Sequence, residues 1–167
     1  MNLYLFQLIN SFAGRYSWLD KLGIFFADWF AYLVILSLLV IAWRHRWPKQ
    51  LLVIPFGSAV AARVVVEIIR FFYHHPRPFV VLADTHKLLD ESSYSFPSGH
   101  ASFFFALATG IYFYNKKLGA CYLLLATVIS IARVFAGIHW PLDILAGAGL
   151  GIATAYLTAR FSKTANQ

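Results

Sequence analysis

Charged residues are scarce in this sequence. Lysine, arginine, aspartate and glutamate make up only 13% of its 167 residues, whereas hydrophobic residues make up 60%. A soluble domain carries about 25% charged residues. The shortage argues against an ordinary soluble domain and points to lipid as the solvent around much of the chain.

Cysteine, repeats and flexible linkers are also missing or nearly so. Cys121 is the single cysteine, so no internal disulfide forms, and a lone thiol does not report the redox compartment. The sequence shows no internal repeat and no low-complexity linker. The N-terminal stretch has neither a basic segment nor a small-residue cleavage site, so it does not resemble a secretory signal. We therefore expect one membrane-embedded domain over residues 1–167.

Five apolar segments are long enough to cross a bilayer, which takes about 20 helical residues. They lie near residues 23–43, 50–73, 98–115, 118–137 and 140–160. Residues 2–13 have a polar stripe that includes Gln7 and Asn10, which predicts an interfacial helix or a short helix packed on the bundle. The predicted fold is all-α, a polytopic membrane bundle of five transmembrane helices plus this N-terminal helix.

The loops divide into two groups by charge. One group has no acidic residue, and its basic residues are Arg44, Arg46, Lys49, Lys116, Lys117, Arg160 and Lys163. The opposite loops mix basic residues with the acidic residues Asp20, Asp84, Asp90 and Glu91. The positive-inside rule puts the first group in the cytoplasm, with the N-terminus and the 74–97 loop outside and the C-terminus inside. Anionic lipid headgroups account for the basic residues, so no nucleic-acid partner is expected.

Several ionisable residues lie inside the predicted spans, where each costs about 2.5–3.5 kcal/mol on insertion scales. Such residues are functional candidates by default. Arg63 and Glu67 are four residues apart, and we interpret them as an ion pair that fixes helix packing. Arg70 lies near the outer end of its span, seven residues before Arg77, and is predicted to be functional. Asp28, in the first span, is assigned a structural role.

Three motifs contain the side chains that a phosphoryl-transfer site needs. They are Arg70-x6-Arg77-Pro78, Pro97-Ser98-Gly99-His100 and Arg133-x5-His139-x3-Asp143. Arginine binds phosphate oxygens with its planar fork, and a helix that starts near Ser98 presents free backbone N–H groups to an anion. The predicted topology places all three motifs at the outer membrane face, so they predict a single phosphate site.

His139 and Asp143 are four residues apart at the predicted start of the last span. A carboxylate bonded to one ring nitrogen leaves the other nitrogen free to attack. The alternative is an interfacial histidine beside a helix-capping aspartate. Spacing alone does not decide whether His100 or His139 is the nucleophile.

No metal or other cofactor is expected. The sequence has no acidic cluster of the kind that holds magnesium. A metal site built from His74, His75, Asp84 and His86 is disfavoured, because their spacing matches no familiar ligand pattern.

The order of these motifs resembles the three-part signature of the phosphatidic acid phosphatase type 2 superfamily, over residues 70–143. The family usually has lysine where Arg70 stands and serine where Ala132 stands. The resemblance implies that His139 forms a phosphohistidine, Asp143 orients it and His100 protonates the leaving oxygen. It also implies phosphate binding by Arg70, Arg77, Ser98, Gly99 and Arg133.

The short chain and compact loops look most like bacterial undecaprenyl-diphosphate phosphatases of the bacitracin-resistance type. This likeness implies metal-independent hydrolysis of an isoprenyl diphosphate at the outer face of the plasma membrane. A phosphatidylglycerophosphate or phosphatidate phosphatase would use the same chemistry. A non-catalytic lipid-binding or transport protein with a relic phosphate pocket is an alternative of another class. The 79–96 loop is interpreted as a lid, a headgroup reader or a solvated loop, and the oligomeric state is left open.

Overall fold

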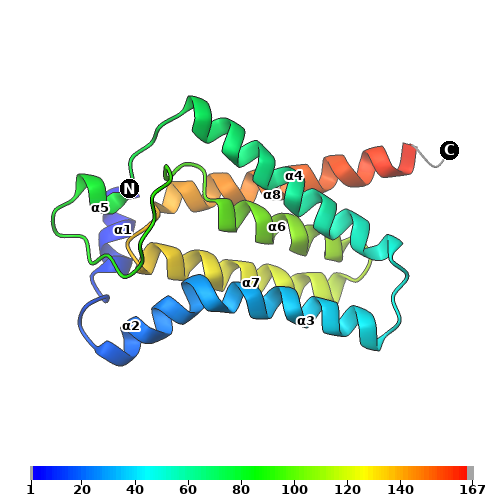
Figure 1. Ribbon diagram of the computed structural model, residues 1–167, viewed down its shortest axis with the longest axis horizontal. Helices are drawn as coiled ribbons and strands as arrows, with labels where there is room; N and C mark the ends of the chain where they lie inside the picture. Colours follow the sequence, from blue (N-terminus) through cyan, green and yellow to red (C-terminus); the bar gives the residue numbers. More distant parts are fainter. Residues whose placement is uncertain (1, 165–167) are drawn as a thin grey trace.

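A computed structural model describes residues 2–164, and every regular element in that range is a helix (Figure 1). In chain order these elements are α1 (Asn2–Asn10), α2 (Ser17–Ile24), the π-helical η1 (Phe25–Trp29), α3 (Phe30–Arg44), α4 (Gln50–Phe72), α5 (Pro78–Val81), α6 (Gly99–Tyr112), α7 (Lys116–Phe135) and α8 (Pro141–Thr164). The long helices run side by side along one axis. The prediction of an all-α membrane bundle is confirmed.

Within the described residues, four helical segments are long and apolar enough to cross a membrane. They are Ser17–Arg44, Leu51–Phe72, Lys116–Phe135 and Pro141–Ser162. They correspond to four of the five predicted spans. The first is longer than predicted, because α2 and η1 run directly into α3 and extend the segment to 28 residues.

The helix predicted over residues 98–115 runs between the two ends of the bundle but is shorter than expected. It forms α6, which has 14 residues. At about 1.5 Å per residue this helix is roughly 21 Å long, shorter than the hydrocarbon core of about 30 Å. Helices α4, α7 and α8 pack around it, and most of its residues are buried. The apolar sequence of α6 therefore reflects burial inside the protein rather than contact with lipid.

Small residues bring α6 and α8 close together. A Cβ added to Gly147 would lie 2.6 Å from the carbonyl oxygen of Ser98, and one added to Gly151 would overlap the carbonyl oxygen of Ser102. Ala155, four residues further on, is fully buried. This stripe fits the backbone of α6 against α8, which holds the start of both helices at one end of the bundle.

Helix α1 packs on the bundle at the same end. Phe6 is buried against Trp140, with ring centroids 5.1 Å apart. The Asn10 side chain donates hydrogen bonds to the carbonyl oxygens of Phe135 at 2.8 Å and His86 at 3.0 Å. Asn10, which belongs to the predicted polar stripe, therefore faces the rest of the protein. The large side chains that remain exposed here are Leu3, Tyr4, Leu5, Leu8 and Phe12.

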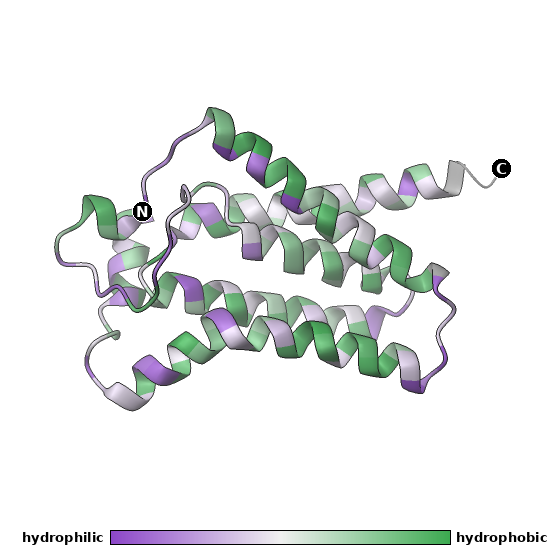
Figure 2. Cartoon of the chain, in the orientation of Figure 1, coloured by the Kyte–Doolittle hydropathy of each residue, from purple (hydrophilic) through white to green (hydrophobic). Residues whose placement is uncertain are grey.

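The outer surface of the bundle is apolar along the long helices. Figure 2 shows hydrophobic residues dominating these helices and hydrophilic residues gathered in the loops at the two ends. Large side chains such as Leu36, Trp43, Val60 and Phe71 are exposed. Such a surface suits lipid, and the chain is a multi-pass membrane protein.

Candidate active site

The three sequence motifs meet at one end of the bundle. Helix α4 ends there, α6 begins there, and α7 leads into α8 there (Figure 1). A cavity of about 360 Å³ lies among them. The predicted site residues that line this cavity are Arg70, Arg77, Gly99, His100, Arg133 and His139. Ser98 and Asp143 are buried next to these lining residues.

His139 and Asp143 form the contact that their spacing predicts. Nδ1 of His139 lies 3.4 Å from Oδ2 of Asp143, and both side chains are only 1% exposed. The same oxygen accepts hydrogen bonds from the Trp140 backbone N–H at 2.8 Å and from the Ser95 hydroxyl. With Nδ1 turned to the carboxylate, Nε2 is the ring nitrogen left for a ligand in the cavity.

The His139 ring is kept neutral by its surroundings. It lies between α7 and α8, outside both spans. Burial lowers the pKa of His139 well below its ordinary 6.5, and the positive charges of Arg133 and Arg77 lower that pKa further. A neutral imidazole has a free lone pair, so His139 is suited to act as a nucleophile at neutral pH.

Arg70 and Arg77 are buried and tied to the loop that precedes α6. Arg70 donates from Nη2 to the Pro97 carbonyl at 2.9 Å. Arg77 donates from Nε to the Ser93 carbonyl at 2.7 Å and from Nη1 to the Ile138 carbonyl at 2.6 Å. Burial lowers the pKa of Arg77 to about 10, so this guanidinium stays charged at neutral pH. These bonds hold two cations against the cavity.

Arg133 brings a third cation to the cavity from α7. Its Nη1 donates to the carbonyl of Ala27 at 3.1 Å and lies 3.4 Å from Nε2 of His100. Arg133 is 2% exposed. Three fixed guanidinium groups around one cavity are suited to an anion with several oxygens, such as phosphate.

Ser98 and Gly99 have different places at the start of α6. The Ser98 hydroxyl accepts from the backbone N–H of Ala101 at 3.4 Å, and its own N–H donates to the carbonyl of Asp143 at 3.0 Å. Ser98 therefore caps α6 and links it to α8. Gly99 lines the cavity itself.

Comparison with known proteins agrees with this geometry. Residues 51–167 match the PAP2 superfamily. The chain belongs to the PAP2 superfamily. It is thus a membrane lipid phosphatase by family, and the predicted resemblance is confirmed.

PAP2 relatives cover most of the chain. It is 34% identical to the bacitracin transport permease protein BcrC of Bacillus licheniformis, over 93% of this chain and 77% of that protein. It is 31% identical to an undecaprenyl-diphosphatase of Sulfolobus acidocaldarius, over 98% of this chain and 79% of that one. It is 27% identical to phosphatidylglycerophosphatase B of Bacillus subtilis, over 78% of this chain and 66% of that one.

A solved PAP2-like structure has the same arrangement of helices. The crystal structure of Aquifex aeolicus LpxE superposes with a TM-score of 0.80 and 31% sequence identity. The match covers 95% of this chain and 94% of that one. The fold that brings the three motifs together is therefore shared with a solved relative.

The two departures from the PAP2 pattern lie in different surroundings. Ala132 packs in an apolar cluster with Ala27, Ala136 and Ile138, and it is not among the residues that line the cavity. Nη2 of Arg70 donates a hydrogen bond to the Pro97 carbonyl, and Nη1 lies 3.4 Å from the hydroxyl oxygen of Ser93. The ammonium of a lysine has no planar fork to reproduce this pair of contacts.

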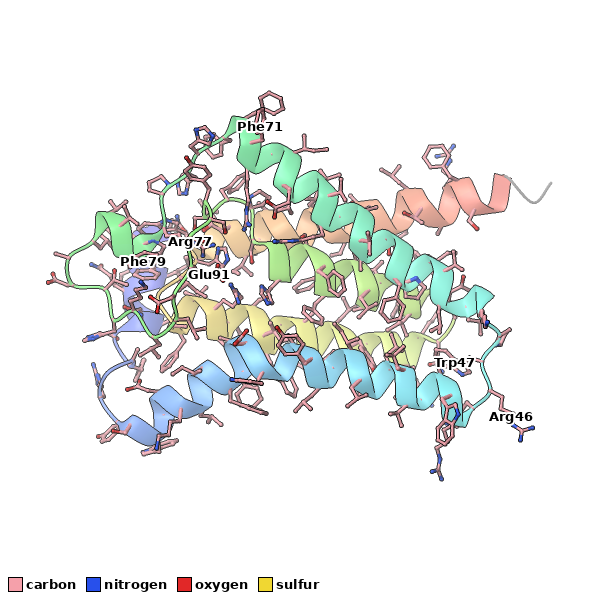
Figure 3. The ribbon with its side chains drawn as sticks, in the orientation of Figure 1. Arg46, Trp47, Phe71, Arg77, Phe79 and Glu91 are labelled. Carbon is pink, nitrogen blue, oxygen red and sulfur yellow. The ribbon has the colours of Figure 1, made fainter. Side chains whose placement is uncertain are left out.

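Sequence reasoning did not single out Glu91 of the 79–96 loop. One carboxylate oxygen, Oε2, lies 3.5 Å from Nη2 of Arg77, and the other, Oε1, forms an ion pair with Arg133. Figure 3 shows Arg77 and Glu91 close together at the loop end of the bundle. The neighbouring Asp90 is exposed and pairs with Lys87, and nothing in the sequence distinguishes the two acids. Glu91 thus places a carboxylate between two of the predicted phosphate ligands.

Arg63 is a second lining residue that sequence reasoning assigned elsewhere. The predicted ion pair is present, with Nη2 of Arg63 at 2.8 Å from Oε1 of Glu67. Arg63 nevertheless lines the same cavity as His100 and His139. Its spacing of seven residues from Arg70, two turns on one helix face, was the signal that this face reaches the site.

Metal ligands are not grouped in the part of the chain that the structure describes. Residues 2–164 contain no cluster of three or more histidine, cysteine, aspartate or glutamate side chains placed to hold a metal ion. Of the four residues weighed as metal ligands, His75 lies beside the site, with Nδ1 3.9 Å from Oδ1 of Asp143. That carboxylate is the one that contacts His139.

Proposed function

We propose that this protein is an integral-membrane phosphatase that hydrolyses an isoprenyl diphosphate to the monophosphate without a metal ion. The substrate is of the undecaprenyl type, and the enzyme needs no cofactor. The reaction takes place at the outer face of the bacterial plasma membrane. The N-terminus and the 74–97 loop are outside and the C-terminus is inside, as the distribution of loop charges supports.

The observation that carries this proposal is the two-part lining of the cavity. Its polar lining consists of four arginines, two histidines and Glu91, and these residues include the cations and the nucleophile. The apolar remainder is formed by Ala31, Tyr32, Ile35, Phe103 and Phe104. Tyr32 is 66% exposed on α3, so the apolar part reaches the outer, lipid-facing surface of the bundle. A phosphorylated lipid has this same division between an anionic head and an apolar chain.

The reaction proceeds in two steps. Nε2 of His139 attacks the terminal phosphorus, the bond from that phosphorus to the bridging oxygen breaks, and His100 gives a proton to the oxygen that leaves. Asp143 stabilises the ring as it becomes positive, and the arginines neutralise charge on the phosphoryl oxygens. His100 then takes a proton from a water molecule as the water oxygen attacks the phosphohistidine, and the P–N bond breaks. Inorganic phosphate is released, and both histidines return to their starting state.

Purified protein in detergent tests the proposal. It should release phosphate from an isoprenyl diphosphate in the presence of a chelator. His139→Ala should lose nearly all turnover, and the intact enzyme should carry acid-labile, base-stable phosphate on His139 during turnover. Activity that disappears with the chelator, or full activity in His139→Ala, would refute the mechanism. Lipid flux that persists in His139→Ala without phosphate release would indicate a transport protein instead.

A glycerol-based substrate is the second candidate. The relative named phosphatidylglycerophosphatase B, at 27% identity, favours it. The phosphohistidine chemistry would be the same, so only the lipid differs. Turnover measured side by side on isoprenyl diphosphate, phosphatidylglycerophosphate and phosphatidate separates the two candidates.

A further inference from the structure

We propose that Arg63 binds the second, lipid-linked phosphate of a diphosphate substrate and so makes the enzyme prefer diphosphates to monophosphates. This inference rests on the proposed function and deepens it. It gives a role to a cation that the phosphohistidine chemistry does not use.

Arg63 lies further from the loop end of the bundle than Arg70 does. It is seven residues before Arg70 on α4, which is about 10 Å along a helix axis. It therefore lies inside a membrane-spanning segment, where a charged side chain is costly and marks a ligand or ion path. The end of α4 holds Arg70 near the loop, whereas Arg63 faces the part of the cavity nearer the bilayer centre.

The absence of a side chain at Gly99 allows Arg63 to reach the site. A Cβ built on Gly99 would overlap Nη1 of Arg63. The guanidinium therefore lies directly against the backbone at the start of α6, next to His100 in the chain. An arginine that served only to pair with Glu67 on its own helix would not need this space on another helix.

One edge of the Arg63 guanidinium is occupied and the other faces the cavity. Nη2 pairs with Oε1 of Glu67, while Nη1 lies against Gly99. The same carboxylate oxygen lies 3.4 Å from Nη1 of Arg70, so a single negative charge is shared by two arginines. A net positive charge is left at this place for an anion. The Arg63 side chain is 46% exposed, which leaves it accessible to a ligand.

The groups that line the cavity correspond to the parts of a lipid diphosphate. Arg77, Arg133 and His139 surround the place of the phosphoryl group that is transferred. Tyr32, Ile35 and Phe103 form the apolar part. Arg63 contributes a cation to the same cavity beside the N-terminus of α6, where the second phosphate of a bound diphosphate would lie. A monophosphate presents an ester oxygen and a carbon there and needs no cation.

The test compares one variant on two substrates. Arg63→Gln is assayed for kcat/KM on an isoprenyl diphosphate and on the isoprenyl monophosphate of equal chain length. A lost charge-assisted contact should lower the diphosphate value about 10- to 100-fold. The monophosphate value should stay within about threefold. Arg63→Lys should recover part of the diphosphate activity, because it restores the charge without the fork.

Two further variants distinguish phosphate binding from helix packing. Val64→Ala changes an exposed neighbour on α4 and should leave both substrates unaffected. Glu67→Gln removes the partner of the ion pair and keeps Arg63. If Arg63 acts only through that pair, Glu67→Gln will reproduce the loss of preference seen in Arg63→Gln. If Arg63 binds phosphate, Glu67→Gln will keep the preference for diphosphate.

An equal loss on both substrates in Arg63→Gln, or no loss on the diphosphate, overturns the inference. Binding of a methylene-bridged isoprenyl diphosphonate gives a reading that does not depend on turnover. Arg63→Gln should weaken this binding and leave the binding of an isoprenyl monophosphonate unchanged. The proposed reaction fails by a different result, namely wild-type protein that releases no phosphate or a His139→Ala variant that still does.

Discussion

At the scale of single residues, the environment of His139 has a measurable consequence for pH dependence. The nucleophile must be neutral, and protonation inactivates it as the pH falls through its pKa. Burial, followed by the charges of Arg133 and Arg77, lowers the pKa of His139 well below 6.5. The neutral form therefore persists below the pH at which an ordinary histidine becomes charged.

We expect the acidic fall of kcat/KM to lie clearly below pH 6.5 for this reason. A profile of kcat/KM measured from about pH 4 to 8 reports the free enzyme. The pH dependence of the inhibition constant of a phosphonate analogue, compared with the analogue's own titration, serves as the control for ionisation of the ligand. An acidic limb centred at the ordinary histidine pKa would contradict the burial argument.

The residues that sequence reasoning found and those it missed differ in one respect. His139 and Asp143 were predictable because they are four residues apart at the start of a helix, with Asp143 in the first turn of α8 and His139 just before it. Glu91 and Ser95 reach the site from an irregular loop, whose path no periodicity describes. Arg63 was visible as a charge in a membrane span, but its nearest neighbour in sequence, Glu67, offered a sufficient local explanation.

At the scale of elements, the 79–96 loop holds a carboxylate where substrate phosphate is expected. Glu91 contacts both Arg77 and Arg133. An incoming phosphate must displace this carboxylate, so Glu91 competes with the ligand. Glu91→Gln removes the competing charge and should tighten inhibition by inorganic phosphate about tenfold.

The inhibition constant for phosphate checks this expectation. Asp90→Asn is the matched control, because Asp90 is the preceding residue, is 99% exposed at its side chain and pairs only locally with Lys87. Weaker phosphate inhibition in Glu91→Gln would mean that the carboxylate mainly positions the two arginines.

Two glycines of α8 allow a paired test of how α6 and α8 pack. An alanine at Gly151 would press its Cβ into the carbonyl oxygen of Ser102, whereas an alanine at Gly149 would meet nothing within 4 Å. Alanine is favoured over glycine in a helix by about 1 kcal/mol. Gly151→Ala should therefore lower the melting temperature in detergent and reduce turnover, and Gly149→Ala should raise the melting temperature or leave it unchanged. Equal behaviour of the two variants would contradict the close packing described above.

The length of α6 could not be predicted from the sequence. Its residues are as apolar as those of the four longer segments, so hydropathy alone predicted a helix of similar length. An apolar run does not reveal whether its neighbours are lipid tails or other helices. The four longer segments are long enough to cross the bilayer, whereas α6 runs between the same two ends of the bundle with only 14 residues.

At the scale of the whole molecule, the proposed orientation predicts which loops are accessible from outside the cell. Cys121→Ser removes the single native thiol. In that background, Asp90→Cys should react with a membrane-impermeant maleimide on intact cells. Lys117→Cys lies at the start of α7 and should react only after lysis. The reverse pattern would place the active site in the cytoplasm.

The general topology of the molecule was predictable because the chain alternates between two faces. Each of the three motifs falls at a boundary between an apolar run and a loop, and the alternation of apolar runs determines which boundaries share a face. The depth of the cavity was not predictable, because it depends on how α3, α4 and α6 are spaced.

The exposed apolar wall of the cavity also determines how the enzyme meets its substrate. Tyr32 on α3 belongs to that wall and lies on the surface that faces the acyl chains. A lipid that enters there diffuses in a plane, so the quantity that governs the rate is its mole fraction in the membrane, not its concentration in solution. Adding inert detergent should therefore lower the rate on the lipid substrate, even when the total amounts of enzyme and substrate are kept constant. The rate on a short, water-soluble diphosphate should not change with added detergent.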